Sequence, residues 1–406
     1  MKIRIKKNID ILELAGIFYT FSIAFSTSTG TALVRFSRLI LLGVVFLTII
    51  SSRKIKKIPI NYFLWSGIFL SFSGISWFWG SSRELVFSSI LTQVYIFVAN
   101  WIILFILYRR VDYIFTLIKT IIWSSILHGL KIYLEHGFTA YLTTRGGTEL
   151  ANANILAFVT SCSIILTIII ITLNKTKFKK LYYVVGAINV IFALLTASKK
   201  IFIYVGVFMA IYFILKANNS LRLIRNLLLI SIIGICTFII IMNVDFLYDL
   251  VGYRIETMIL GFIGGETDGS TSFRLNLIKW GMEWFREKPI FGYGLNCYKY
   301  LLGTTYNTWA GSSGVYAHNN YVELLVDLGV VGTLIYYSIY FSILRKSYKL
   351  NRIKSNLGKL SLAFMISLMV AEYGQVSYSI AFLQEIILII WFLTSEFYSK
   401  DKSKES

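Results

Sequence analysis

Long apolar segments constrain this chain more than any other feature of its sequence. An α-helix needs about 17–25 mostly apolar residues to cross the hydrocarbon core of a bilayer. The mean hydropathy of +0.70 and the 56% hydrophobic residues exclude a soluble globular domain. Twelve segments of this kind predict an all-α polytopic membrane protein with about 12 transmembrane helices, at 9–26, 33–51, 59–79, 85–107, 112–134, 152–173, 181–197, 200–216, 222–243, 320–342, 359–377 and 381–398.

The distribution of the 40 Lys and Arg residues orients these helices, because cytoplasmic connections carry an excess of basic residues. With the N-terminus inside, 26 of the 40 basic residues fall in inside segments. Both termini are then cytoplasmic, and topology accounts for the net charge of +20 without nucleic acid binding. The inside segments are the N-terminus, 53–57, 109–110, 175–180, 216–225, 345–359 and 400–404.

The predicted topology divides the chain into three parts. Residues 1–243 carry transmembrane helices one to nine, residues 244–319 form a long extracytoplasmic loop, and residues 320–406 carry helices ten to twelve and a cytoplasmic tail. A connection of that length is typically functional. Within it, residues 274–288 have apolar side chains at helical spacing, which predicts an amphipathic helix on the membrane interface that Pro289 ends.

His318 lies at the end of this loop, directly before the predicted helix 320–342. Histidine titrates near neutral pH, so at a membrane surface it can accept a proton during a reaction. Glu323 follows five residues later, which is too far for the same helical face. Glu323 would therefore orient His318 only if the helix begins irregularly, and a polar contact between helices is the alternative.

Cations in external segments are informative because topology alone does not explain them. Lys199 and Lys200 fill a short hairpin before helix 200–216. They are either interfacial lysines with charged ends in water or an anion site that suits a lipid diphosphate. Arg254 and Arg274 lie in the long loop, where a solvated arginine is the alternative to a ligand contact.

Asn154, near the start of the predicted helix 152–173, is either a helix cap or a ligand for sugar or phosphate. The sequence has no cysteine–histidine cluster and no glycine-rich nucleotide loop, so we expect neither a metal nor another cofactor. An outward-facing enzyme without nucleotide needs an activated substrate in the membrane. A lipid diphosphate-linked sugar is one, and external cations would stabilise its departing diphosphate.

Two short motifs carry a family resemblance. The first is Lys-Pro-Ile-Phe-Gly-Tyr-Gly at 288–294, and the second is Ala-His-Asn-Asn-Tyr at 317–321, followed by Glu323, Gly329 and Gly332. This arrangement resembles the O-antigen ligase/polymerase family of bacterial membrane glycosyltransferases. The resemblance implies a glycosyltransferase C-like (GT-C) fold and an active site outside the cytoplasmic membrane. It also implies inverting, metal-independent transfer from undecaprenyl diphosphate-linked glycans.

The resemblance also implies roles for individual residues. By position, His318 is the catalytic base and Arg274 binds the diphosphate. Lys199 and Lys200 stand where the family has a Ser-Arg pair, and they keep the charge without the bidentate guanidinium. Arg254 is a further candidate for the diphosphate, and the candidates for sugar contact or for orienting the base are Asn154, Asn319 and Glu323.

We predict a polysaccharide polymerase that joins undecaprenyl diphosphate-linked repeat units of the O-antigen or capsule type. The chain ends soon after its last helix, whereas protein-glycosylating relatives often carry a large external C-terminal domain. Its Ile-, Lys- and Asn-rich composition is consistent with an AT-rich genome, of which a Gram-positive genome without lipid A is one kind. The expected partners are the lipid-linked glycans, the bilayer, and flippase and chain-length regulator proteins.

Three alternatives stay open. A ligase would transfer the finished glycan to another acceptor. A flippase for lipid-linked oligosaccharides would need ionisable residues along a path through the bilayer, for which the candidates are Lys119, Lys131, Glu372 and Glu385. A non-catalytic subunit of an assembly complex would not need His318 and Arg274.

Overall fold

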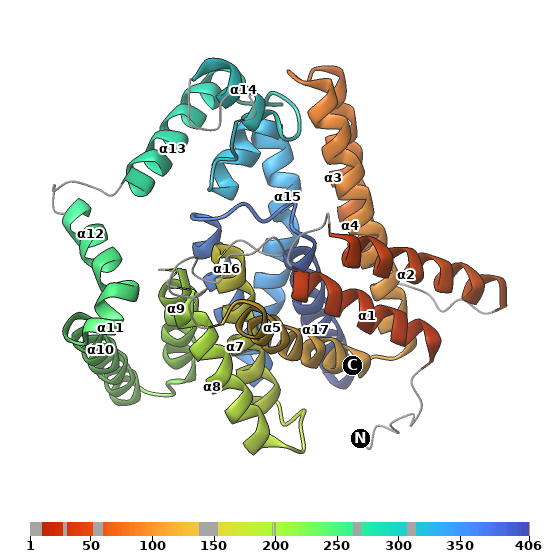
Figure 1. Ribbon diagram of the computed structural model, residues 1–406. Helices are drawn as coiled ribbons and strands as arrows, with labels where there is room; N and C mark the ends of the chain where they lie inside the picture. The colour runs from red at the N-terminus through yellow and green to blue at the C-terminus, as the bar shows by residue number, and fades with distance from the viewer. Residues whose placement is uncertain are drawn as a thin grey trace. The chain divides into compact units, whose positions relative to one another are not determined.

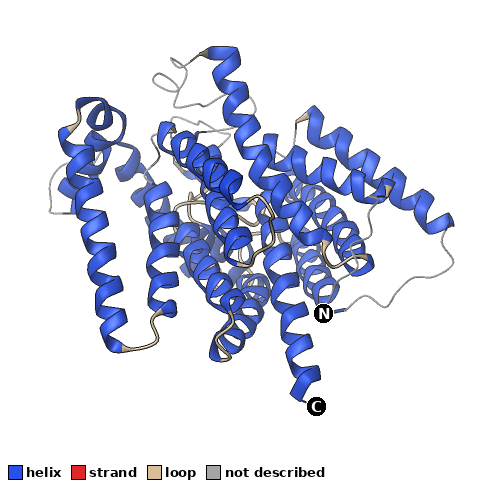
Figure 2. Cartoon of the chain, turned by 90° about the horizontal axis from the view of Figure 1, so that it is seen from below, coloured by secondary structure: helices blue, strands red, loops and turns tan. Residues whose placement is uncertain are grey.

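The computed structural model describes residues 10–26, 31–51, 60–137, 153–196, 198, 200–262, 269–306 and 314–405. Every regular element in these ranges is a helix, and none of these residues forms a strand (Figure 2). The prediction of an all-α protein is therefore confirmed.

Each of the twelve predicted apolar segments coincides with a helix. The bounds are α1 (Ile11–Ser26), α2 (Ala32–Ser51), α3 (Ile60–Ile75), α4 (Arg83–Arg109), α5 (Tyr113–His136), α7 (Ala153–Thr172), α8 (Lys179–Leu195), α9 (Lys200–Lys216), α10 (Ser220–Asn243), α15 (Asn320–Arg352), α16 (Asn356–Glu372) and α17 (Ala381–Glu405). The last part of the predicted segment 59–79 is a 3-10 turn, η1 (Ser76–Phe78). α15 continues well past the predicted end at 342.

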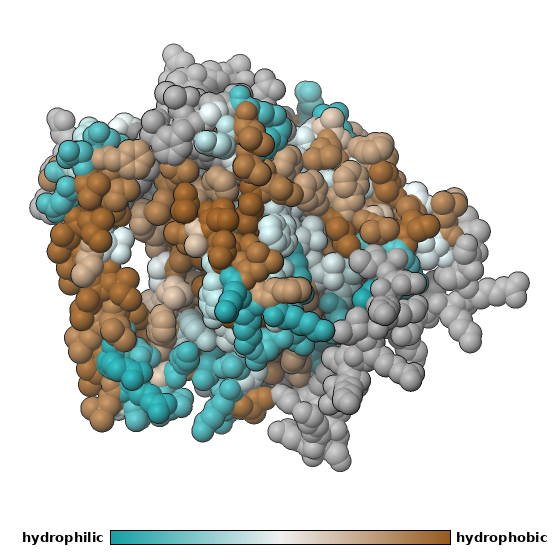
Figure 3. Space-filling view, turned by 60° about the horizontal axis from the view of Figure 1, so that its bottom comes forward, coloured by the Kyte–Doolittle hydropathy of each residue, from teal (hydrophilic) through white to brown (hydrophobic). Residues whose placement is uncertain are grey.

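Among the described residues, five helices are long and apolar enough to cross a membrane: α4, α5, α7, α10 and α15. α1 is apolar but shorter. Large apolar side chains are also exposed on the surface, where they form a broad brown area in Figure 3. These features indicate a membrane protein, since long apolar helices and exposed apolar side chains are stable in lipid. The count of twelve spans and the GT-C-like fold stay predictions.

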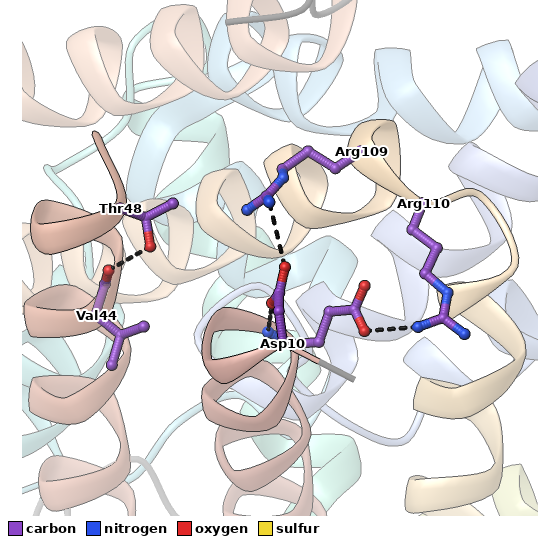
Figure 4. A network of polar contacts seen from close by, with 6 residues as sticks. Asp10, Val44, Thr48, Arg109 and Arg110 are labelled. Atoms are coloured by element: carbon purple, nitrogen blue, oxygen red, sulfur yellow. Dashed lines mark hydrogen bonds and ion pairs between the residues drawn. The ribbon is translucent and has the colours of Figure 1, made fainter. Parts of the chain in front are cut away.

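The first of two compact units contains Met1–Leu64, Val94–Thr196 and Ile380–Ser406. Within it, α1 packs against α2 and α5, and α7 packs against α5 and α8. Asp10 forms an ion pair with Arg109 at 3.2 Å, as Figure 4 shows. Glu13 pairs with Arg110 at 2.7 Å. The start of α1 and the end of α4 therefore lie together, which the predicted topology requires.

The second compact unit contains Trp65–Gln93 and Ala197–Ser379, and it holds the predicted external loop. Here α15 packs against α16, and α16 packs against α9. α13 and α14 both pack against α15 (Figure 1). The helices within the loop are α11 (Asp245–Leu247), the π-helix η2 (Tyr248–Gly252), α12 (Tyr253–Phe262), α13 (Gly269–Glu287) and α14 (Cys297–Thr305).

The amphipathic helix predicted at 274–288 is α13, which begins one turn earlier than expected, at Gly269. Its tryptophans pack inside the second unit. Trp284 is only 6% exposed, with its ring edge-on to that of Tyr298, and Trp280 stacks on Tyr306 with ring centroids 4.1 Å apart. The expectation that these aromatic side chains rest on the membrane interface is therefore wrong for Trp284, because the adjacent helix α14 covers it.

Candidate active site

The two halves of the sequence motif meet where α15 is interrupted. Gly329 has φ 64° and ψ −169°, so the helical hydrogen-bond ladder breaks there. The loop 289–294 replaces the lost partners. The N–H groups of Tyr293 and Gly294 donate to the carbonyls of Val326 and Asp327 at 2.9 and 2.7 Å. The N–H of Val330 donates to the carbonyl of Pro289 at 2.8 Å. Buried backbone groups need such partners, so the break and the loop depend on each other.

Glycine is required on both backbones where the loop 289–294 meets the break in α15. A Cβ on Gly292, where φ is +67°, would lie 2.5 Å from the carbonyl oxygen of Val326. A Cβ on Gly329 would lie 2.2 Å from the carbonyl oxygen of Ile290. Only glycine combines a positive φ with so close an approach of two backbones. The spacing of the motif therefore reflects a loop locked against a broken helix.

Asp327 holds the next helix, α14, in place. Its side-chain oxygens accept the N–H groups of Asn296 and Tyr298, both at 2.7 Å, and the hydroxyl of Tyr378 at 3.2 Å. These contacts satisfy donors at the start of α14, as a capping carboxylate does. Asp327 is fully buried and has a structural role.

His318 lies at the start of α15 in an irregular backbone conformation, with φ +54°. The helix begins directly after it. Asn319 is the N-cap, and its side-chain oxygen accepts the N–H groups of Tyr321 and Val322 at 3.0 and 3.1 Å. Asn319 was predicted to contact sugar or to orient the base, and the structure shows that it fixes the helix start next to His318. A contact with sugar stays a prediction.

Glu323 supports the same short segment. It is 1% exposed, and its carboxylate accepts the N–H of Ala317 at 2.5 Å. Because His318 is not helical, the separation of five residues does not keep Glu323 from this segment. The condition set by the sequence, an irregular helix start, is met. Glu323 holds the backbone immediately before His318.

Two cations share the surroundings of the imidazole. Burial of the ring lowers the pKa of His318 most, and the positive charges of Arg274 and Lys200 lower it further, to about 3. The ring also lies against Tyr316, with centroids 4.1 Å apart. Imidazole in this environment is neutral at physiological pH, so it has a free lone pair to accept a proton.

These cations come from separate elements of the second unit. Arg274 is in the second turn of α13 and half-buried. The helix approaches α15 closely, since a Cβ on Gly281 would lie 2.4 Å from Val322 Cγ1. Lys200 is the first residue of α9, and its ammonium lies 3.4 Å from Oε1 of Gln375. The charges of two predicted site residues, Arg274 and Lys200, thus act on a third, His318, although the three are far apart in sequence.

Three further residues were predicted for the site. Asn154 is in the first turn of α7, in the first unit. Lys199 and the side chain of Arg254 lie outside the described residues; the backbone of Arg254 belongs to α12. Their roles stay predictions. Among the described residues, no group of His, Cys, Asp and Glu side chains has the geometry to hold a metal.

Sequence reasoning missed the segment between α16 and α17. The side-chain oxygen of Asn320 accepts the N–H groups of Ser377 and Tyr378 at 2.9 and 3.2 Å, and its amide donates to the hydroxyl of Tyr337 at 2.8 Å. This ties the start of α15 to the segment that carries Gln375. Asn320 was the available signal in the sequence, since a buried side-chain amide needs hydrogen-bond partners from another segment.

These features define a helical membrane protein with a neutral histidine beside two cations. Residues 182–337 match the family model described as O-antigen ligase, and this range includes Lys200, Arg274 and His318. The segment therefore belongs to the O-antigen ligase/polymerase family, whose members are glycosyltransferase-like enzymes, and the resemblance seen in the sequence is confirmed. A search of curated proteins found no match.

Proposed function

We propose that this protein is a polysaccharide polymerase that joins undecaprenyl diphosphate-linked repeat units on the outer face of the bacterial cytoplasmic membrane. One observation carries the proposal: the charges of Arg274 and Lys200 both act on the neutral imidazole of His318. A base next to an anion site is what transfer from a lipid diphosphate to a hydroxyl requires.

The reaction follows from these roles. The acceptor hydroxyl oxygen attacks the anomeric carbon of the donor sugar and forms the new glycosidic bond. The bond from that carbon to the diphosphate oxygen breaks, and its electron pair leaves with the undecaprenyl diphosphate. His318 takes the proton of the attacking hydroxyl. Attack opposite the leaving group inverts the anomeric centre, and the cationic side chains do the work that a metal ion would otherwise do.

The same cations couple donor binding to the strength of the base. In the free enzyme, Arg274 and Lys200 disfavour a proton on His318. The negative charges of a bound diphosphate offset those cations, so binding raises the pKa of His318. The imidazole becomes a better base when a donor is in place, and it stays unprotonated when the site is empty.

A ligase-type transfer to another acceptor is the second candidate. The family match carries the ligase description, and base and cations would serve both reactions equally. The acceptor distinguishes them, since a polymerase uses the sugar end of a second lipid-linked unit. The partners would be the lipid-linked glycans and the flippase that delivers them.

The test uses purified protein in nanodiscs with lipid-linked repeat units. A ladder of longer glycans supports the polymerase, and a single transfer to an added acceptor supports the ligase. Activity that persists in a metal chelator supports metal-independent transfer. If wild type and His318→Ala yield indistinguishable products, the assignment of the base is wrong.

A further inference from the structure

A buried glutamine lies next to one of the two cations. Gln375 is 5% exposed and belongs to the segment between α16 and α17. Its side-chain oxygen faces two donors from one face of α9, the Lys200 ammonium at 3.4 Å and the Tyr204 hydroxyl at 3.5 Å. The backbone of the same segment is fixed to Asn320, two residues after His318.

The Lys200 ammonium settles which way the amide points. A flipped amide would turn its own N–H groups toward the Lys200 ammonium, which carries only donors. Oε1 of Gln375 therefore faces Lys200, and Nε2 faces away from it. Nε2 is buried and has no hydrogen-bond partner among the described residues. Buried donors in folded proteins are usually paired, so Nε2 has the capacity to donate a hydrogen bond to a ligand.

The amide oxygen of Gln375 is a neutral acceptor, and this affects the charge next to Lys200. A carboxylate there would hold the Lys200 ammonium more firmly, but it would also cancel the positive charge that an anion needs. An amide oxygen fixes the position of the ammonium without itself neutralising the charge. The lowered pKa of His318 is consistent with a Lys200 charge that acts on its surroundings.

We propose that Gln375 is part of the diphosphate site: through Oε1 it positions the ammonium of Lys200, and through Nε2 it donates a hydrogen bond to an oxygen of the same anion. The inference rests on the proposed function, because the anion it names is the leaving group of that reaction. It adds a neutral donor, from a segment outside the matched residues 182–337, to the cations of α9 and α13.

The substitution Gln375→Glu separates this role from a purely structural one. Glutamate has the same size and still accepts from Lys200 and Tyr204, so a packing role predicts a stable protein with unchanged ligand binding. A role in the anion site predicts the opposite, because the carboxylate quenches Lys200 and replaces the Nε2 donor with a negative oxygen. Gln375→Met removes both contacts without adding charge.

The measurement is calorimetric titration of geranyl diphosphate, a short lipid diphosphate, into purified protein in nanodiscs. We expect Gln375→Met to weaken binding about tenfold, the usual effect of losing a hydrogen bond to a charged group, and Gln375→Glu to weaken it further. The control is Asn356→Asp, the same amide-to-carboxylate change at an exposed position in α16, which should bind like wild type.

Each result decides the matter. If Gln375→Glu binds as well as wild type, or better than Gln375→Met, the inference is overturned while the proposed function stands. If wild type itself does not bind the lipid diphosphate, the proposed function is overturned, and this inference with it. Thermal unfolding of each variant, measured in the same nanodiscs, confirms that weaker binding reflects the folded site.

Discussion

Two candidate membrane spans of the second unit, α10 and α15, differ in what their side chains contact. Only 11% of the apolar window of α10 is buried, against 56% in α15. α10 is regular and exposes leucine and isoleucine along its length. α15 buries Asn320, Glu323 and Asp327 and is interrupted at Gly329.

The difference indicates which residues serve the site. Buried polar groups in a membrane helix cost free energy unless they are paired, and those of α15 are paired with backbone groups of the neighbouring loops. Asp327 holds α14, Glu323 holds the residue before His318, and Asn320 holds the segment of Gln375. α15 is therefore the element that organises the site, whereas α10 is a candidate span with few buried side chains.

The largest effect on activity should come from His318, the residue directly before α15. His318→Ala should lower kcat by about 10²–10⁴-fold, the usual contribution of a general base. Thermal unfolding should change little, since the ring is only partly buried and its backbone is fixed by the contacts at Ala317 and Asn319. The rate of glycan elongation measures the first quantity. If His318→Ala unfolds at a lower temperature than wild type, the claim that His318 serves catalysis and contributes little to stability is contradicted.

Matched glycines test the scaffold next. Gly329→Ala in α15 should destabilise the protein by about 3 kcal/mol or more, because φ is positive and a Cβ would meet the carbonyl of Ile290. Gly234→Ala in α10 should be neutral or stabilising, since no atom lies within 4 Å of its Cβ position. Denaturation of the purified proteins compares the two. If the two substitutions change the free energy of unfolding equally, α15 and α10 do not differ in how tightly their glycines are packed.

A smaller effect is expected from the carboxylate that holds α14. Asp327→Asn leaves one oxygen for two N–H groups, so one bond at Asn296 or Tyr298 is lost, which costs about 1–3 kcal/mol. The control is Asp249→Asn at an exposed position of η2, which should be neutral. Unfolding free energies measure both. Wild-type stability in Asp327→Asn would show that the cap contributes nothing.

The sequence was sufficient to predict the helices, because apolar length and basic residues are local properties. All twelve predicted segments coincide with helices. The resemblance also led to His318, Arg274 and the 199–200 lysine pair as site residues, and their chemistry stays a prediction. The charge of Lys200 contributes to the lowered pKa of His318, and Lys199 lies outside the described residues.

Contacts between distant segments could not be predicted. The role of Gly329 depends on Ile290, and that of Asp327 depends on the backbone of α14. Gln375 gives no signal in the sequence, because a single glutamine near the end of the predicted apolar segment 359–377 is ordinary. Its position beside Lys200 follows from the packing of α16 on α9.

The central claim is that His318 is a neutral base whose proton affinity the neighbouring cations hold down. The most direct measurement is the pH dependence of kcat/KM between pH 4.5 and 8, which reports groups of the free enzyme. Because the pKa of His318 is lowered, wild type should show no acid limb near pH 6.5. Arg274→Gln removes one cause of the lowering, so its acid limb should move to higher pH, whereas the exposed Arg286→Gln on the same helix should behave like wild type. An acid limb near pH 6.5 in wild type that stays in place in Arg274→Gln would contradict the account.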